Sequence, residues 1–250
     1  MTAQAALPRR AVAELVGTAA LVTVVVGSGI RAAGLSPDPG TALLANSLAS
    51  AIGLGLLIAL LSPVSGAHLN PVVTLCAWWY EGRRGRAAAL EALTYVAAQL
   101  AGAAAGAVLA DLMFGRRPGT WSTHTRSEWH LLLGETVATA GLVLLITGLR
   151  RTGRARFAPV GVAAYIAAAI WFTSSGSFAN PAASVGRSLS DSFAGIAPAS
   201  LPGFVAAQLV GGTLGAGLAV LLYGRPRRMS AASVRPAERA RRGESLDLAS

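Results

Sequence analysis

Two short stretches built around Asn-Pro most constrain the fold of this chain. They are residues 65–72, with Asn70 and Pro71, and residues 177–182, with Asn180 and Pro181. Asn before Pro suits a helix start, because the Asn oxygen can cap a free N–H and Pro loses no bond there. Both stretches lie between apolar runs, and irregular backbone at membrane depth needs surrounding protein or a wet cavity. We therefore predict two short helices inside a membrane protein, whose facing positive ends favour neutral polar solutes over cations.

The composition indicates a polytopic membrane protein. The chain is 53% hydrophobic and 13% charged, whereas a soluble domain carries about 25% charged residues. Six apolar runs are long enough to cross a bilayer: about 11–30, 41–61, 87–114, 130–149, 158–172 and 201–223. The net charge of +10 comes from arginines in loops and tails between these runs, which argues against nucleic-acid binding.

The distribution of arginines predicts the orientation. With the N-terminus in the cytoplasm, 16 arginines lie inside, and only Arg31, Arg116, Arg117, Arg126 and Arg187 lie outside. This asymmetry follows the positive-inside rule and requires an even number of spans. We expect a multi-pass protein of the inner, cytoplasmic membrane with both termini in the cytoplasm.

The two halves of the chain repeat each other. Residues 13–21 align with residues 134–142, and Val-Ala-Ala-Gln-Leu occurs at both 96–100 and 205–209. Because each half has three spans, the second half must be inserted upside down. Inverted repeats of this kind place a permeation site near the middle of the bilayer.

At the two motifs, Asn70-Pro71-Val72 and Asn180-Pro181-Ala182, the chain resembles the aquaporin and glycerol-facilitator family, whose members carry two Asn-Pro-Ala motifs. The resemblance covers about residues 9–224. It implies an all-α membrane protein with six transmembrane helices and two re-entrant half-helices. It also implies a homotetramer of passive channels, with no enzymatic activity, cofactor or metal. The channel domain is expected at 11–224, with inverted repeats at about 11–114 and 130–224. A cytoplasmic segment, 1–10, precedes it, and a disordered basic tail, 225–250, follows it.

The motifs also predict the groups that line the pore. Asn70 and Asn180 can each offer an amide N–H to a solute while the oxygen caps a helix. The carbonyls before them form a ladder of acceptors: Gly66, Ala67 and His68 in one loop, and Ser177, Phe178 and Ala179 in the other. The His68 side chain is interpreted as packed beside its loop; a proton carrier or a metal ligand is the alternative, although no second His or Cys stands at ligand spacing.

Glu14 and Glu135 are ionisable residues within apolar spans, so a role in function is the default. Their equivalent places in the repeat favour a supporting role, in which each accepts backbone N–H groups from the loop of its own half. The resemblance implies the same role. A proton relay is the alternative.

The selectivity constriction departs from the family pattern. In the resembled family an arginine stands three residues after the second Asn, and here that position is Ala183. Counting from the motifs without gaps gives the other ring positions as Ser50, Ala168 and Ser177. A ring of four small, uncharged residues predicts a wide filter of low selectivity. Arg187 is expected either at the outer vestibule or in an ion pair with Asp191.

These residues predict a passive channel for small uncharged solutes in a lipid bilayer. The small-residue filter and the sequence around the second motif resemble a bacterial branch associated with arsenic detoxification, which implies arsenous acid or other neutral metalloid hydroxides beside glycerol and water. A general water and glycerol facilitator is the main alternative. An ion-coupled secondary transporter would need Glu14 and Glu135 as its ion site, and a membrane enzyme would need a catalytic cluster that the sequence lacks.

Overall fold

The computed structural model describes residues 5–80, 82 and 85–225, and this part of the chain is helical and contains no strand. Six long helices are apolar enough to cross a membrane: α1 (Leu7–Leu35), α2 (Pro39–Ser65), α4 (Arg86–Met113), α5 (Trp129–Arg151), α6 (Ala158–Phe172) and α8 (Leu201–Tyr223). Two short helices follow the Asn-Pro motifs, α3 (Pro71–Tyr80) and α7 (Pro181–Ser188). The 3-10 turns η1 (Ala155–Phe157) and η2 (Pro198–Ser200) precede α6 and α8. The predicted fold class is confirmed.

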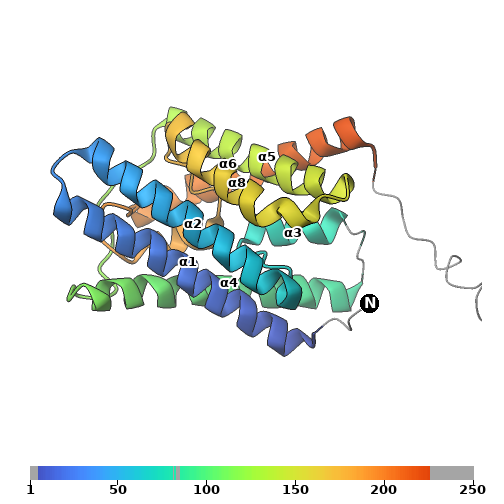
Figure 1. The fold of residues 1–250 in the computed structure, drawn as a ribbon, viewed down its shortest axis with the longest axis horizontal. Helices are drawn as coiled ribbons and strands as arrows, with labels where there is room; N and C mark the ends of the chain where they lie inside the picture. The colour runs from blue at the N-terminus through green and yellow to red at the C-terminus, as the bar shows by residue number, and fades with distance from the viewer. Residues whose placement is uncertain (1–4, 81, 83–84, 226–250) are drawn as a thin grey trace, which may run out of the picture.

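The long helices run roughly along the long axis of the molecule, and α3 lies between α4 and α8 (Figure 1). Helix α1 packs along α4 in the first half, and α5 packs along α8 in the second. Both α3 and α7 contact α4 and α8, so each half-helix touches both halves of the chain. The arrangement follows the repeat seen in the sequence.

Glycines allow the paired helices to approach closely. A Cβ atom added at Gly106 of α4 would lie 2.2 Å from the carbonyl oxygen of Ala19 in α1. A Cβ atom at Gly215, the repeat equivalent in α8, would lie 2.3 Å from the carbonyl oxygen of Ala140 in α5. Neither position can hold a side chain unless the helices separate, and small residues are typical of close contacts between membrane helices.

The first helix is longer than its apolar run. Helix α1 begins at Leu7, so residues 7–10 of the predicted N-terminal segment are helical, with a proline in the first turn. The Arg10 guanidinium pairs with Glu91 of α4 at 2.6 Å, which ties the start of α1 to α4. Most of the predicted tail, residues 226–250, lies outside the described residues, as do Arg83 and Arg84.

Candidate functional site

The two Asn-Pro loops meet in the middle of the bundle. The Asn70 amide donates to the carbonyl oxygen of Ala179 at 2.7 Å, and the Asn180 amide donates to the carbonyl oxygen of Leu69 at 2.8 Å. The oxygen of Asn70 accepts from Val72 N at 2.9 Å. The oxygen of Asn180 accepts from the N–H groups of Ala182 and Ala183 at 3.0 and 3.2 Å. Each asparagine therefore caps its own half-helix and binds the opposite loop.

Both loops have backbone that local propensity disfavours. Ala67, Leu69, Ser177 and Ala179 adopt φ values between 45° and 50°, a region that residues other than glycine seldom occupy. The same alternation occurs at matching positions in the two loops. Such strain persists only where surrounding contacts fix it, and the loops are held from behind by two buried carboxylates.

Glu14 and Glu135 supply those carboxylates, one to each loop. Glu14 accepts from the N–H groups of His68 and Leu69 at 2.9 and 2.6 Å. Glu135 accepts from the N–H groups of Phe178 and Ala179, both at 2.8 Å. Both glutamates are 0% exposed, and neither lines the cavity.

Two glutamines complete this support and were missed as site residues. Gln99 donates to Glu14 at 2.8 Å, and Gln208 donates to Glu135 at 2.6 Å. Each also donates to a hydroxyl group of a half-helix, Thr74 in α3 or Ser184 in α7. Their signal in the sequence is the identical Val-Ala-Ala-Gln-Leu repeat, whose glutamine is the polar member.

A cavity of about 370 Å³ passes between the loops. Asn70 and Asn180 line it, together with the loop residues Gly66, Ala67, His68, Ser177, Phe178 and Ala179. Arg150 and Ala155 line one end, and Arg126, Arg187 and Phe193 line the other. Pro71, Val72, Pro181 and Ala182 are buried in the half-helices and do not line the cavity.

Three of the four predicted filter residues, Ser50, Ser177 and Ala183, line the cavity. The prediction for Ala168 is wrong, because Ala168 is exposed on the outer side of α6. The cavity is lined instead by Val162, Ile166 and Ile170, which lie about one turn apart on the opposite face. Counting residues back from Asn180 does not give the rotation of α6 about its own axis, so it selected a residue on the wrong face of the helix.

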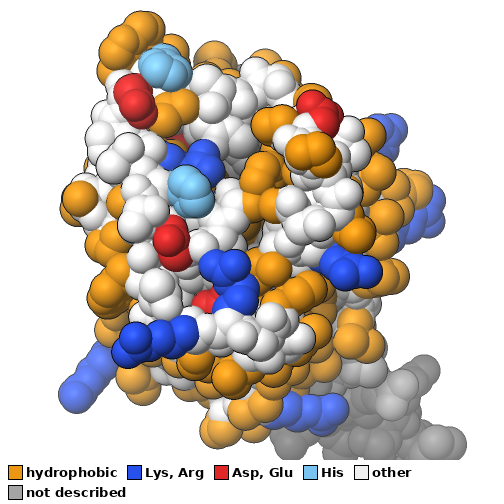
Figure 2. Space-filling model, turned by 90° about the vertical axis from the view of Figure 1, so that its left-hand side faces the viewer, with side chains coloured by type: hydrophobic (Ala, Val, Ile, Leu, Met, Phe, Trp, Pro, Cys, Tyr) orange, Lys and Arg blue, Asp and Glu red, His pale blue; other side chains and the backbone are white. Residues whose placement is uncertain are grey.

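The end of the cavity near the α4–α5 loop is rich in arginine. The Arg187 guanidinium lies 3.2 Å from the ring centroid of Phe178, and its Nε donates to Ala194 O. The Arg126 guanidinium lies 5.3 Å from the same centroid. In Figure 2, charged side chains gather over this end of the molecule, and hydrophobic side chains cover its flanks.

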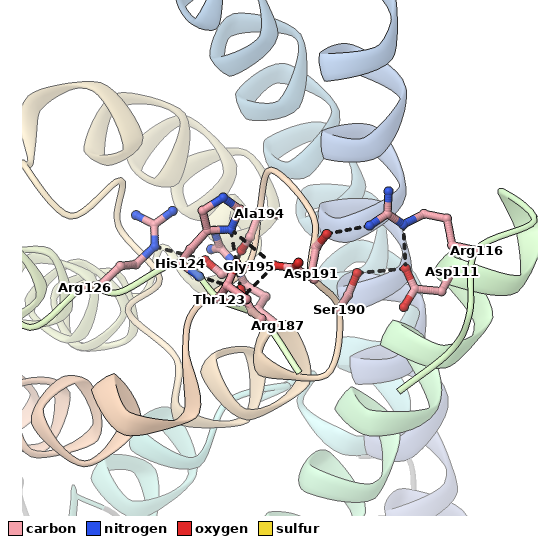
Figure 3. A network of polar contacts seen from close by, with 11 residues as sticks. Asp111, Arg116, Thr123, His124, Arg126, Arg187, Ser190, Asp191, Ala194 and Gly195 are labelled. Atoms are coloured by element: carbon pink, nitrogen blue, oxygen red, sulfur yellow. Dashed lines mark hydrogen bonds and ion pairs between the residues drawn. The ribbon is translucent and has the colours of Figure 1, made fainter. Parts of the chain in front are cut away.

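Asp191 does not pair with Arg187, so the alternative prediction of an ion pair between these two residues is wrong. Its carboxylate accepts from the N–H and hydroxyl groups of Thr123 at 2.9 and 3.0 Å (Figure 3). The backbone hydrogen bond from Thr123 contributes most to lowering the pKa of Asp191 below its ordinary value, and the hydroxyl bond from Thr123 contributes next. Arg187 is thereby left in the cavity wall.

His68 is held within its loop. Its Nδ1 lies 3.2 Å from the hydroxyl of Thr74, and its ring meets Tyr95 edge to face with centroids 5.3 Å apart. The described residues include no cluster of His, Cys, Asp and Glu that could hold a metal.

The sequence and fold both match known membrane proteins. The family described as major intrinsic protein matches residues 1–190. "Aquaglyceroporin AqpS" of Rhizobium meliloti is 46% identical over 206 residues, covering 82% of this chain and 86% of that protein. "Aquaporin AqpM" of Methanothermobacter marburgensis is 32% identical, covering 87% and 96%.

The fold also resembles the X-ray structure of the aquaglyceroporin from Plasmodium falciparum. The TM-score is 0.60 at 20% identity, and the match covers 85% of this chain and 95% of that one. The six apolar helices and the family match establish a multi-pass membrane protein that is a passive channel and not an enzyme. The chain belongs to the major intrinsic protein family.

Proposed function

We propose that small uncharged solutes pass through the cavity between the two Asn-Pro loops, and that glycerol, water and neutral metalloid hydroxides such as arsenous acid are among them. The observation that carries this proposal is the pair of hydrogen bonds by which Asn70 and Asn180 each bind a carbonyl of the opposite loop, in the wall of a cavity lined by both loops. Because one amide hydrogen of each asparagine binds the opposite loop, its second hydrogen is available to a solute.

The lining supports exchange of hydrogen bonds along the path. Loop carbonyls on one side can accept from a solute hydroxyl while the central amides donate to it. A solute that exchanges bonds in this way avoids the cost of losing water without replacement, which is about 1–3 kcal/mol for each group left unpaired. The opposite wall, formed by Val162, Ile166 and Ile170, offers no hydrogen bonds, so it favours solutes with one apolar side.

The small filter residues support passage of solutes larger than water. Ser50, Ser177 and Ala183 project few atoms, and Ala183 stands where the resembled family carries an arginine. The printed names of the relatives include both aquaglyceroporin and aquaporin, and we extend glycerol and water conduction to this chain on that basis. Arsenous acid follows from its neutral, polyol-like shape and the wide ring.

An ion-coupled transporter is disfavoured by the glutamates. Glu14 and Glu135 are fully buried, engaged by backbone N–H groups and glutamine amides, and absent from the cavity wall. A coupling ion would have to break these bonds to reach them.

We further propose that the channel is a homotetramer in the inner membrane with both termini in the cytoplasm. The arginine-rich end of the described cavity at Arg126 and Arg187 would then be its outer mouth. Large apolar side chains exposed along the flanks, among them Leu56, Leu60, Val160 and Leu221, supply surface for lipid and for neighbouring subunits.

Stopped-flow light scattering on proteoliposomes containing the full chain tests the function. We expect glycerol and arsenous acid uptake well above that of protein-free liposomes, rising linearly with the gradient. Uptake that saturates and follows an ion gradient would instead support a transporter. Fast water flux without solute flux would support a narrow water channel.

A further inference from the structure

The loop between α4 and α5, residues 114–128 and here named the outer loop, is fastened to the segment that follows α7. The fastening bonds are Ser122 N to Ser188 O at 2.9 Å, Thr123 N to Asp191 Oδ1 at 2.9 Å, Ala197 N to His124 O at 2.7 Å, and Arg126 N to Ser200 Oγ at 2.9 Å. Arg116 and Asp111 extend the network at the start of the loop (Figure 3). The loop therefore has a fixed path across this end of the molecule.

This path brings the Arg126 side chain into the cavity wall. Its Nε donates to Gly195 O at 3.0 Å, and its Nη1 lies 3.5 Å from Ser175 O. No hydrogen-bond partner for Nη2 is found within the described residues. Burial lowers the pKa of Arg126, but arginine stays protonated in proteins, so a charged donor faces the cavity.

Arg126 carries its charge at the cavity wall, and Glu135 and Glu128 are the acidic groups that act on it. None of the described residues that line the cavity is acidic, whereas Arg126 and Arg187 both line this end. Arg187 is held by the Ala194 carbonyl and lies over the Phe178 ring. Both arginines keep terminal nitrogens without a hydrogen bond to the described residues, but the Phe178 ring covers one face of the Arg187 guanidinium at 3.2 Å, whereas Arg126 lies 5.3 Å from that ring. Arg126 therefore has the more open face toward a solute oxygen.

Position 183 provides no donor of this kind. Ala183 is 6% exposed and lines the same cavity. We infer that Arg126, supplied by the outer loop, determines solute selectivity in place of an arginine at position 183, an inference that rests on the proposed function. Its guanidinium narrows the mouth, donates to hydroxyl oxygens of small polyols and repels cations.

Three variants of the full chain test this in proteoliposomes, with stopped-flow permeability to ribitol and glycerol as the readout. Arg126→Ala removes the guanidinium, and Arg117→Ala is the control, since Arg117 is an exposed arginine of the same loop. The double variant Arg126→Ala with Ala183→Arg returns a guanidinium from α7. Because removing the guanidinium widens the mouth for the larger polyol, the ribitol-to-glycerol permeability ratio should rise about tenfold in Arg126→Ala, a change of about 1.4 kcal/mol.

Support requires this rise, no change in Arg117→Ala, and a ratio restored toward wild type in the double variant. A loop that had merely collapsed would not be repaired by an arginine on α7. If Arg126→Ala cannot be purified, Arg126→Gln removes the charge at similar length and must shift the ratio in the same direction. The inference is overturned if Arg126→Ala matches Arg117→Ala, or if flux is lost and not restored. A wild-type chain that passes neither polyol would overturn the proposed function itself, and this inference with it.

Discussion

Asn70 and Asn180 bind each other's loops through matched hydrogen bonds of 2.7 and 2.8 Å to the carbonyls of Ala179 and Leu69. The two inverted halves are thereby joined at the centre of the path. Each asparagine also keeps its oxygen in a helix cap, so its amide can face only the opposite loop and the cavity. The orientation of both donors is fixed before any solute arrives.

Replacing Asn180 should separate its two tasks. Asn180→Ala loses the cap of α7 and the bond to Leu69, and should lower stability by about 1–2 kcal/mol for the cap alone. Asn180→Asp keeps a capping oxygen but loses the donor, so it should be more stable than Asn180→Ala yet conduct glycerol poorly. Thermal unfolding in detergent and glycerol flux measure the two effects. Equal melting temperatures for the two variants would contradict the capping role.

The carboxylates behind the loops should be essential. Glu135→Gln leaves one of two buried N–H groups, those of Phe178 and Ala179, without an acceptor, at a cost of about 1–3 kcal/mol. We expect a lower melting temperature and loss of most glycerol flux. Glu128→Gln, an exposed change just before α5, is the control and should behave as wild type. A Glu135→Gln protein with full flux would show that the loop does not need this support.

Two glycines of α8 provide a matched test of helix packing. A Cβ at Gly215 would lie 2.3 Å from Ala140 O, whereas nothing lies within 4 Å of a Cβ at Gly217. Gly215→Ala should therefore reduce yield and melting temperature. Gly217→Ala should be neutral or stabilising, because Ala is favoured over Gly in helices by about 1 kcal/mol. If both variants melt alike, α5 and α8 do not pack as described.

The outer loop should depend on pH through Asp191. Its hydrogen bonds to Thr123 lower its pKa in the folded protein. A lowered pKa means that these hydrogen bonds are at full strength above the ordinary carboxyl range. They weaken as the pH falls through the pKa of Asp191 in the folded protein. Limited proteolysis of the outer loop should thus be slow near neutral pH and faster in acid. Asp191→Asn should raise the cleavage rate near neutral pH and make it depend less on pH. If its cleavage rate depends on pH as in wild type, the Asp191–Thr123 hydrogen bonds do not hold the outer loop.

The sequence was sufficient for much of this architecture because the relevant signals are local or repeated. Capping by Asn180 and the start of α7 at Pro181 follow from the side chains themselves, and the repeat pairs Glu14 with Glu135. Arg126 was predicted only as a loop arginine outside the membrane. Its place at the cavity depends on bonds between segments far apart in the chain, which no local pattern encodes.

Other features needed the three-dimensional structure for different reasons. Ala168 was assigned to the filter by counting, but a helical side chain points according to the rotation of its helix, and that rotation brings Ile170 to the cavity. The left-handed backbone at Leu69 and Ala179 contradicts the preference of those residues. It is imposed by buried contacts, which is the usual way that local rules fail at a functional site.

The measurement that tests the central claim most directly compares wild type with Ala183→Arg for uptake of glycerol and arsenous acid by proteoliposomes. The claim is that solutes pass the ring at Ser50, Ser177 and Ala183. An arginine at position 183 should then add a barrier of at least about 1.4 kcal/mol, which slows uptake of both solutes about tenfold. Rapid uptake of both solutes by wild type and this loss in the variant would support the account. Uptake that Ala183→Arg leaves unchanged would contradict it, because the solutes would then be crossing elsewhere.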